Sequence, residues 1–205
     1  MKMLLIRHGE TEWNKLGRFQ GQKDIALNAR GLAQAKETAQ ALEIGKEMAI
    51  YSSPLHRTMQ LAQEISQVAQ VPVVPVPSLK ELALGDLEGV TGAEMRSKWP
   101  QVYATWRNDP GSLVMPNGES LVQLQERAWR AVTDLEQAHG NDDVLVVVSH
   151  NFAIRTIIGR LLGMPLSNFH RMTLSLSSIC TVEIDDRGRR LVSYNSTCHL
   201  SPENR

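Results

Sequence analysis

The amino-acid sequence predicts an α/β fold, a three-layer sandwich in which helices cover both faces of a mostly parallel central sheet. Short apolar runs of strand length alternate with longer segments whose apolar residues recur at helical spacing. Several of the short runs end abruptly in polar residues. Because a single core can grow to roughly 250 residues before chains split, we expect the 205 residues to form one domain, 1–205.

Three continuous apolar runs predict the central strands, at residues 3–6, 48–51 and 144–148. Such runs, without alternating polar residues, are typical of strands that are buried on both faces of a parallel sheet. Polar residues follow each run at once, and they include Arg7 and His8 after the first run and His150 after the third.

The remaining strand signals are weaker. Residues 71–77 contain three prolines, and proline donates no hydrogen bond to a sheet ladder, so we expect an edge strand at best. Two β-branched segments near the end of the chain, 179–184 and 191–194, flank a turn sequence that ends at Gly188. This pattern predicts a hairpin.

Four segments carry the helical pattern, at residues 28–42, 54–68, 119–139 and 152–162. Asn28 is a candidate N-cap, Leu32 lies on the apolar face of the first helix, and Pro54 is allowed in the first turn of the second. Residues 93–116 hold two short helical patterns that prolines interrupt. We expect this region to form a partial lid near 91–118.

Composition limits the partners. The 22 basic and 22 acidic side chains cancel, which removes the overall field that favours nucleic acid or an anionic membrane. No stretch reaches the roughly 20 apolar residues of a membrane helix, and the apolar run at the N-terminus is shorter than that of a signal peptide. With only two cysteines, a cytoplasmic protein without nucleic-acid or membrane partners is expected.

The polar residues after the strands predict an anion site. Ligands of open α/β sheets collect outside the carboxyl ends of the strands, where Arg7, His8 and His150 are expected to meet Arg57 from the start of the second helix. The planar fork of arginine matches phosphate oxygens, and helix N-termini add backbone donors. In a chain of zero formal charge, this cluster is a local site for a phosphate group.

Other kinds of site lack their signatures. Clustered histidines also suit a metal ion, but no Cys-x-x-Cys, His-Glu-x-x-His or acidic ligand run accompanies them. The glycine-rich loops that bind nucleotides and the Gly-x-Ser-x-Gly turn of serine hydrolases are also absent from the sequence. We therefore expect neither a metal nor another cofactor.

Four stretches of the sequence carry a resemblance to a known family. They occur in the family's order and are Arg7-His8-Gly9-Glu10-Thr11, Ser52-Ser53-Pro54-Leu55-x-Arg57-Thr58, the segment from Glu81 to Gly89, and Val148-Ser149-His150. They resemble the signatures of the histidine phosphatase superfamily, phosphoglycerate-mutase-like branch, and span nearly the whole chain. The resemblance implies a phosphoglycerate-mutase-like fold.

The resemblance also implies roles for individual residues. His8 matches the nucleophile that accepts the phosphoryl group, while Arg7, Arg57 and His150 match the groups that bind its oxygens. Glu81 matches the proton donor to the leaving oxygen, which later activates water. The residues expected to bind the substrate are Asn14, Gln20, Gly21, Asn151 and His199.

The substrate is less narrowly indicated. Residues 91–116 contain only two arginines, Arg96 and Arg107, whereas phosphoglycerate mutases of this branch have an arginine-rich lid, so phosphatase activity is favoured. Residues 194–200 resemble the tail of metal-independent phosphoserine phosphatases, in which the tail reaches the active site. His199 would there meet a substrate carboxylate. Leu84, however, occupies a position where those enzymes usually present a histidine.

Phosphoserine is therefore the leading candidate among small phosphorylated metabolites. The alternatives are a phosphoglycerate mutase, a phosphatase of sugar phosphates or α-ribazole phosphate, and a non-catalytic protein that binds phosphorylated ligands. A homodimer is possible.

Overall fold

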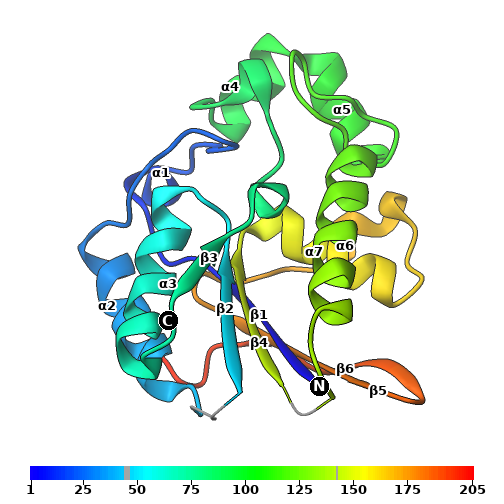
Figure 1. Ribbon diagram of the computed structural model, residues 1–205. Helices are drawn as coiled ribbons and strands as arrows, with labels where there is room; N and C mark the ends of the chain where they lie inside the picture. The colour runs from blue at the N-terminus through cyan, green and yellow to red at the C-terminus, as the bar shows by residue number, and fades with distance from the viewer. Residues whose placement is uncertain (44–46, 142) are drawn as a thin grey trace.

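A computed structural model describes residues 1–43, 47–141 and 143–205. Its centre is a six-stranded sheet with the strand order β3-β2-β4-β1-β5-β6 (Figure 1). The strands are β1 (Lys2–Arg7), β2 (Met48–Ser52), β3 (Val73–Pro75), β4 (Val144–Ser149), β5 (Ile179–Asp185) and β6 (Gly188–Ser196). The first four run parallel, while β5 pairs antiparallel with both β1 and β6. The predicted α/β fold is confirmed, including the edge strand and the hairpin.

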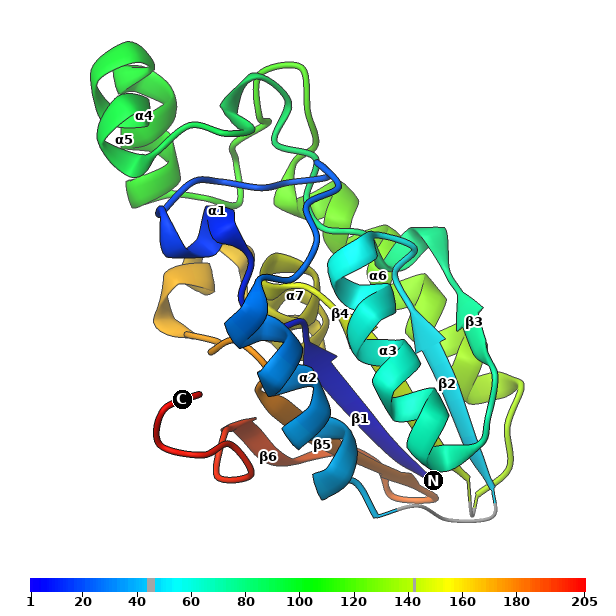
Figure 2. The same ribbon diagram turned by 90° about the vertical axis from the view of Figure 1, so that its left-hand side faces the viewer.

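Helices cover both faces of this sheet. Helices α2 (Ala29–Ala41) and α3 (His56–Ala69) lie on one face, and α6 (Leu121–Gln137) and α7 (Asn151–Leu161) lie on the other (Figure 2). Successive side chains of a strand point to opposite faces. In β1, Leu4 and Ile6 join the core under α2 and α3, and Met3 and Leu5 join the core under α6. Burial on both faces explains why the central strands have continuous apolar sequences.

The structure corrects three expectations about the helices: where two of them begin, and which residue of α2 is buried. Asn28 does cap α2, since its Oδ1 accepts from the Gly31 N–H at 2.9 Å. Pro54, however, precedes α3, which begins at His56, and α6 begins at Leu121 after the capping residue Ser120. Leu32, expected on the buried face of α2, is 37% exposed.

The reason for the exposure of Leu32 lies in the polar residues of α2. Gln34 and Thr38 are buried on this helix. The Gln34 side chain accepts from the Glu10 N–H and donates to the Asn204 carbonyl. The helix is therefore rotated so that these polar groups, and not Leu32, face the interior.

The segments that surround the site lie beyond the carboxyl ends of the parallel strands. They include α1 (Glu12–Lys15), which was not predicted, and α4 (Gly92–Lys98) and α5 (Pro100–Asn108), which stand at the top of the molecule, opposite the N-terminus (Figure 1). Short 3-10 helices lie at Pro77–Leu79, Gly85–Leu87 and Leu166–Arg171. None of the described helices combines the length and the apolar character that a membrane span requires.

Candidate active site

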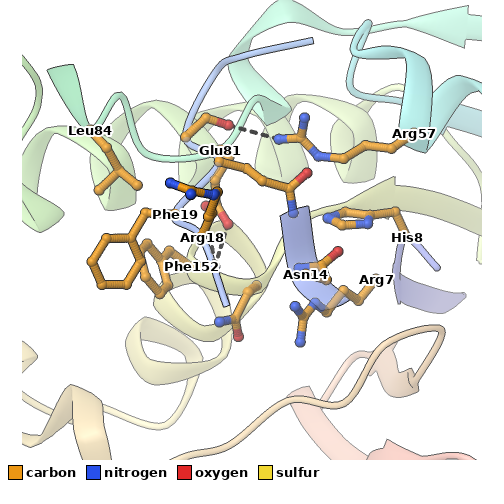
Figure 3. Close-up of a pocket in the computed structure, with 12 residues that line it drawn as sticks. Arg7, His8, Asn14, Arg18, Phe19, Arg57, Glu81, Leu84 and Phe152 are labelled. Atoms are coloured by element: carbon orange, nitrogen blue, oxygen red, sulfur yellow. Dashed lines mark hydrogen bonds between the residues drawn. The ribbon is translucent and has the colours of Figure 1, made fainter. Parts of the chain in front are cut away.

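Eight of the ten residues predicted for the site surround one pocket at the carboxyl ends of the parallel strands (Figure 3). They are Arg7, His8, Asn14, Gln20, Gly21, Arg57, Glu81 and Asn151. The pocket has a volume of about 100 Å³.

His8 is held in one orientation and one tautomer. Its backbone N–H donates to the Ser149 carbonyl, and its own carbonyl accepts from Ser177. The Nδ1 atom of the ring lies 2.7 Å from the Gly9 carbonyl oxygen, which can only accept, so Nδ1 carries the proton. Burial, together with the positive charges of Arg57 and Arg7, holds the pKa of His8 well below 6.5. The ring is therefore neutral, and its Nε2 lone pair is free to act as a nucleophile.

The loop that carries His8 packs closely against α2. A Cβ atom on Gly9 would lie 2.7 Å from the Gly31 carbonyl oxygen, and one on Gly31 would lie 2.1 Å from that of Glu10. Side chains at these positions would clash with the backbone. The absence of side chains at Gly9 and Gly31 thus lets the loop after β1 pack against α2, and this contact fixes the position of His8 in the pocket.

Arg57 is clamped on three sides. Its Nη1 donates to the Lys23 carbonyl and its Nη2 to the Gly21 carbonyl, both at 2.7 Å. The Nε atom donates to His150 Nδ1 at 3.3 Å. The guanidinium is fully buried, and desolvation lowers its pKa to about 10, so it stays charged at neutral pH. Because these bonds fix its plane, Arg57 is a pre-oriented cation for phosphate oxygens.

Arg7 supplies a second cation. Its Nη1 donates to the Leu174 carbonyl, and burial lowers its pKa to about 10. Within the described part of the chain, its Nε is buried and has no hydrogen-bond partner. An unpaired buried donor is costly unless a ligand completes it. This atom is therefore available to an anion in the pocket.

Glu81 is anchored at the N-terminus of α7. Its Oε1 accepts from the backbone N–H groups of Leu82, Phe152 and Ala153 at 2.9, 3.2 and 3.2 Å. Its Oε2 accepts from Phe152 at 3.1 Å. The positive end of a helix dipole suits a carboxylate. The side chain is thus held rigidly at the wall of the pocket, in reach of a group bound there.

Two amide side chains turn their donors toward the pocket. Thr11 Oγ1 lies 3.0 Å from Asn14 Oδ1 and 2.9 Å from Gln20 Oε1. Asn14 Oδ1 also accepts from the Thr11 backbone N–H at 3.1 Å, so the single hydroxyl hydrogen of Thr11 is available for Gln20 Oε1. The NH₂ groups of Asn14 and Gln20 are then left for the pocket that both residues line. They add neutral donors to the two arginines.

Residues 3–197 match the histidine phosphatase superfamily, branch 1. The chain belongs to this superfamily. Phosphoserine phosphatase 1 of Hydrogenobacter thermophilus is 34% identical over 200 residues, which cover 98% of this chain and 94% of that protein. A metal-independent phosphoserine phosphatase of Arabidopsis thaliana is 35% identical over 205 residues, which cover 98% of this chain and 83% of that protein.

A solved structure agrees with this histidine phosphatase over its whole length. It is the phosphoserine phosphatase of Entamoeba histolytica in complex with 3-phosphoglyceric acid, with a TM-score of 0.85, 35% identity and coverage of 98% of this chain and 99% of that one. The family and these relatives make the protein a phosphoric monoester hydrolase.

Two predicted site residues of the histidine phosphatase do not line the pocket. His150 is fully buried behind it: its ring centroid is 5.2 Å from that of His8, its Nδ1 accepts from Arg57, and its Nε2 donates to Ser53 Oγ at 2.8 Å. The structure places it as a support of Arg57. His199 lies farther away, with Nε2 3.1 Å from Thr38 Oγ1 of α2.

Sequence reasoning missed part of the pocket wall. Arg18, Phe19 and Phe152 line the pocket, and so does Leu84, which the sequence marked only as a departure from a pattern. The available signal was adjacency, because Arg18 and Phe19 precede Gln20 and Phe152 follows Asn151. Among the residues that the structure describes, no group of three or more His, Cys, Asp or Glu side chains could hold a metal ion.

Proposed function

We propose that this histidine phosphatase hydrolyses small phosphomonoesters without a metal, through a phosphohistidine at His8. The observation that carries the proposal is the fixed tautomer of His8, whose Nδ1 is bound to Gly9 and whose Nε2 lone pair is free. Phosphoryl transfer needs positioning and charge stabilisation above all. Arg7 and Arg57 would supply the charge that a metal ion supplies elsewhere, with the amides of Asn14 and Gln20 as further donors.

The reaction has two steps. In the first, His8 Nε2 attacks phosphorus, the bond from phosphorus to the ester oxygen breaks, and Glu81 gives its proton to the departing alcohol. In the second, a water molecule gives a proton to Glu81 and attacks the phosphohistidine. The nitrogen–phosphorus bond breaks, inorganic phosphate leaves, and His8 and protonated Glu81 are restored.

Phosphoserine is the first substrate to examine. Relatives at 34% and 35% identity bear the name phosphoserine phosphatase, and one structural neighbour was solved with 3-phosphoglyceric acid. Both compounds are small and carry a carboxylate beside the phosphate ester. Phosphoglycerate mutase activity is the outcome that would replace the proposal.

The remaining features stay predictions from the sequence. They are a cytoplasmic location, a homodimer, a single domain and a lid near residues 91–118. Trapping α4 and α5 with engineered cysteines and measuring turnover would test the lid, and light scattering would test the dimer.

A trapping experiment tests the mechanism. After brief exposure to ³²P-labelled substrate and a denaturing quench, we expect one acid-labile phosphate per chain, in the presence of excess chelator. In His8→Ala, the label should disappear and kcat should fall at least about 10⁴-fold. His56→Ala is the matched control, because His56 is exposed and pairs only with Asp24.

Retention of turnover in His8→Ala would refute the phosphohistidine. Loss of activity on chelation, restored by a divalent ion, would place the protein in another class of phosphatase. Stoichiometric interconversion of phosphoglycerates, in place of phosphate release, would identify a mutase.

A further inference from the structure

One end of the pocket has a different character from the rest. Phe19, Leu84 and Phe152 lie together on the side away from Arg7, His8 and Arg57 (Figure 3). Leu84 is 4% exposed and packs in the apolar cluster that also contains Phe19 and Phe152. We call these three side chains the apolar wall.

The mechanism determines what meets the apolar wall. Arg7, His8 and Arg57 hold the phosphoryl group at one end of the pocket, and Glu81 lies between them and the apolar wall (Figure 3). The leaving oxygen must face Glu81 to take its proton. The carbon substituent on that oxygen is therefore directed toward Phe19, Leu84 and Phe152. A substituent too large for this pocket extends beyond the apolar wall.

A second cavity begins at this end. It has a volume of about 440 Å³, and Phe19 lines both cavities. The other lining residues are Met95, Tyr103, Trp106, Arg107 and His170. The Trp106 ring packs on Phe152 of the apolar wall, with ring centroids 5.5 Å apart. The rings of Phe19 and Trp106 thus link the phosphate pocket to an aromatic cavity beneath α4 and α5.

Two polar groups near the apolar wall already have partners. The Nη1 atom of Arg18 donates to the Gly89 carbonyl at 2.6 Å and lies 3.8 Å from Glu94. His170 Nε2 donates to the Trp106 carbonyl at 2.6 Å. An aromatic or alkyl group would gain from leaving water.

We propose that the aromatic cavity is the leaving-group subsite, and that it selects phosphomonoesters whose alcohol carries an aromatic or extended apolar group over esters of small alcohols without one. The proposal rests on the proposed function, because it uses the phosphohistidine geometry to orient the substrate. Leu84 is the residue that sets the preference at the entrance. Trp106 and Tyr103 provide flat surfaces on which a ring can stack.

Two pairs of compounds separate binding at this cavity from intrinsic reactivity. Propyl phosphate and 3-phenylpropyl phosphate are esters of alcohols with nearly the same acidity, so they differ only in the ring. We expect kcat/KM to be at least about tenfold higher for the phenylpropyl ester, the gain typical of burying a large apolar side chain. The phosphonates with the same two groups should show the same ratio of Kd by calorimetry, without turnover.

A substitution of Leu84, at the entrance of the aromatic cavity, tests its role in substrate preference. Leu84→His places a polar ring on the apolar wall and should lower the ratio of kcat/KM for phenylpropyl over propyl phosphate at least about threefold, while the ratio for phosphoserine over propyl phosphate rises. Leu162→His is the matched control, since Leu162 is 54% exposed at the end of α7. It should leave both ratios unchanged.

The outcomes separate the two proposals. Equal Kd values for the two phosphonates would overturn the subsite, even in an active enzyme. A Kd ratio of tenfold or more without turnover of any ester would support the subsite and refute the phosphatase mechanism. If Leu84→His does not fold, the phosphonate pair on the unmodified chain decides alone.

Discussion

The two ends of the active-site pocket are built in different ways. At the phosphate end, His8, Arg57 and Glu81 are each fixed by hydrogen bonds to backbone groups. At the leaving-group end, Phe19, Leu84 and Phe152 are held by packing alone. Hydrogen bonds are directional and fix charges in place, whereas apolar contacts have no preferred direction. The chemistry and the choice of substrate therefore belong to separate groups of residues, and changes at one end should leave the other intact.

The largest effect is expected at the phosphate end, from Arg57→Ala. Removal of a cation that stabilises the transition state should lower kcat/KM about 10²–10³-fold. The loss should be equal for phosphoserine and 3-phenylpropyl phosphate, since both present the same phosphate. Arg57→Lys should be nearly as poor, because a lysine cannot bond the Gly21 and Lys23 carbonyls and His150 together.

Steady-state kinetics with both substrates measures this effect. Arg160→Ala is the control, because Arg160 lies over the Trp129 ring on the far side of α7. A loss confined to one substrate would break the comparison, since it would mean that Arg57 also recognises the leaving group.

The next effect concerns the support of Glu81. Arg127 of α6 donates to the carbonyls of Ser78, Lys80 and Glu81, each at 2.8 Å, and pairs with Glu119 at 2.8 Å. This clamp makes Arg127 a positioning residue. Arg127→Gln should lower kcat about 10–100-fold, with KM for both substrates changed less than about threefold, because proton donation and not binding is disturbed.

The readout that distinguishes positioning from general destabilisation is the leaving group. With 4-nitrophenyl phosphate, whose alcohol departs without a proton donor, the loss of kcat/KM in Arg127→Gln should shrink to a few-fold, because kcat/KM excludes the later attack of water that also uses Glu81. Arg130→Gln, one turn along the same helix at an exposed position, is the control. An equal loss for the nitrophenyl and alkyl esters would contradict the role.

The pH dependence of stability should come from the phosphate end. Burial, with Arg57 as the next cause, holds the pKa values of His8 and His150 well below 6.5 in the folded protein. In the unfolded chain, both rings take up protons near pH 6.5. Below that pH the unfolded state binds more protons, so stability falls as the pH falls. From pH 7.5 to 5.5 we expect a loss of about 2–3 kcal/mol for the two rings together.

Urea unfolding at the two pH values measures the loss. His150→Gln, which removes one of the two rings, should reduce this loss by about 1 kcal/mol. A pH-independent free energy of unfolding would show that folding does not lower the pKa values of the two rings, and this would count against their burial beside Arg57.

The same comparison explains how far the sequence could predict the site. Arg7 and His8 directly follow one predicted strand, and Arg57 lies at the start of the helix after another, so their place at the carboxyl edge depends on topology alone. The apolar wall has no such pattern, because Phe19, Leu84 and Phe152 come from three separate segments that only tertiary folding brings together.

The burial of polar residues on α2 could not be predicted from the sequence for a related reason. Hydrophobic periodicity placed Leu32 inside, but Gln34 and Thr38 are the residues that face inward, because their partners lie at Glu10 and in the C-terminal tail. Neither partner is near them in the sequence. The same holds for the inference that His199 reaches the pocket, which assumed a path for the tail.

The smallest effect is expected for His199. The structure docks the tail on α2, where Glu37 accepts from Ser201 and Asn204 and His199 contacts Thr38. Burial lowers the pKa of His199 below 6.5, so at neutral pH its ring is uncharged and a weak partner for a carboxylate. His199→Ala should therefore change kcat/KM by less than about twofold, equally for phosphoserine and propyl phosphate, and lower stability by about 1 kcal/mol.

Thr38→Val removes the same contact from the other side, so a double-mutant cycle with His199→Ala should show that the two stability losses are not additive. The tail borders the phosphate end and not the apolar wall, because Thr197 and Arg205 line a cavity of about 530 Å³ together with Arg7 and Asn14. A disturbance of the tail should therefore change turnover through Arg7, and by the same factor for substrates with different leaving groups. A rise in KM for phosphoserine alone would show instead that His199 swings to the substrate carboxylate, and the tail would then belong to the leaving-group end.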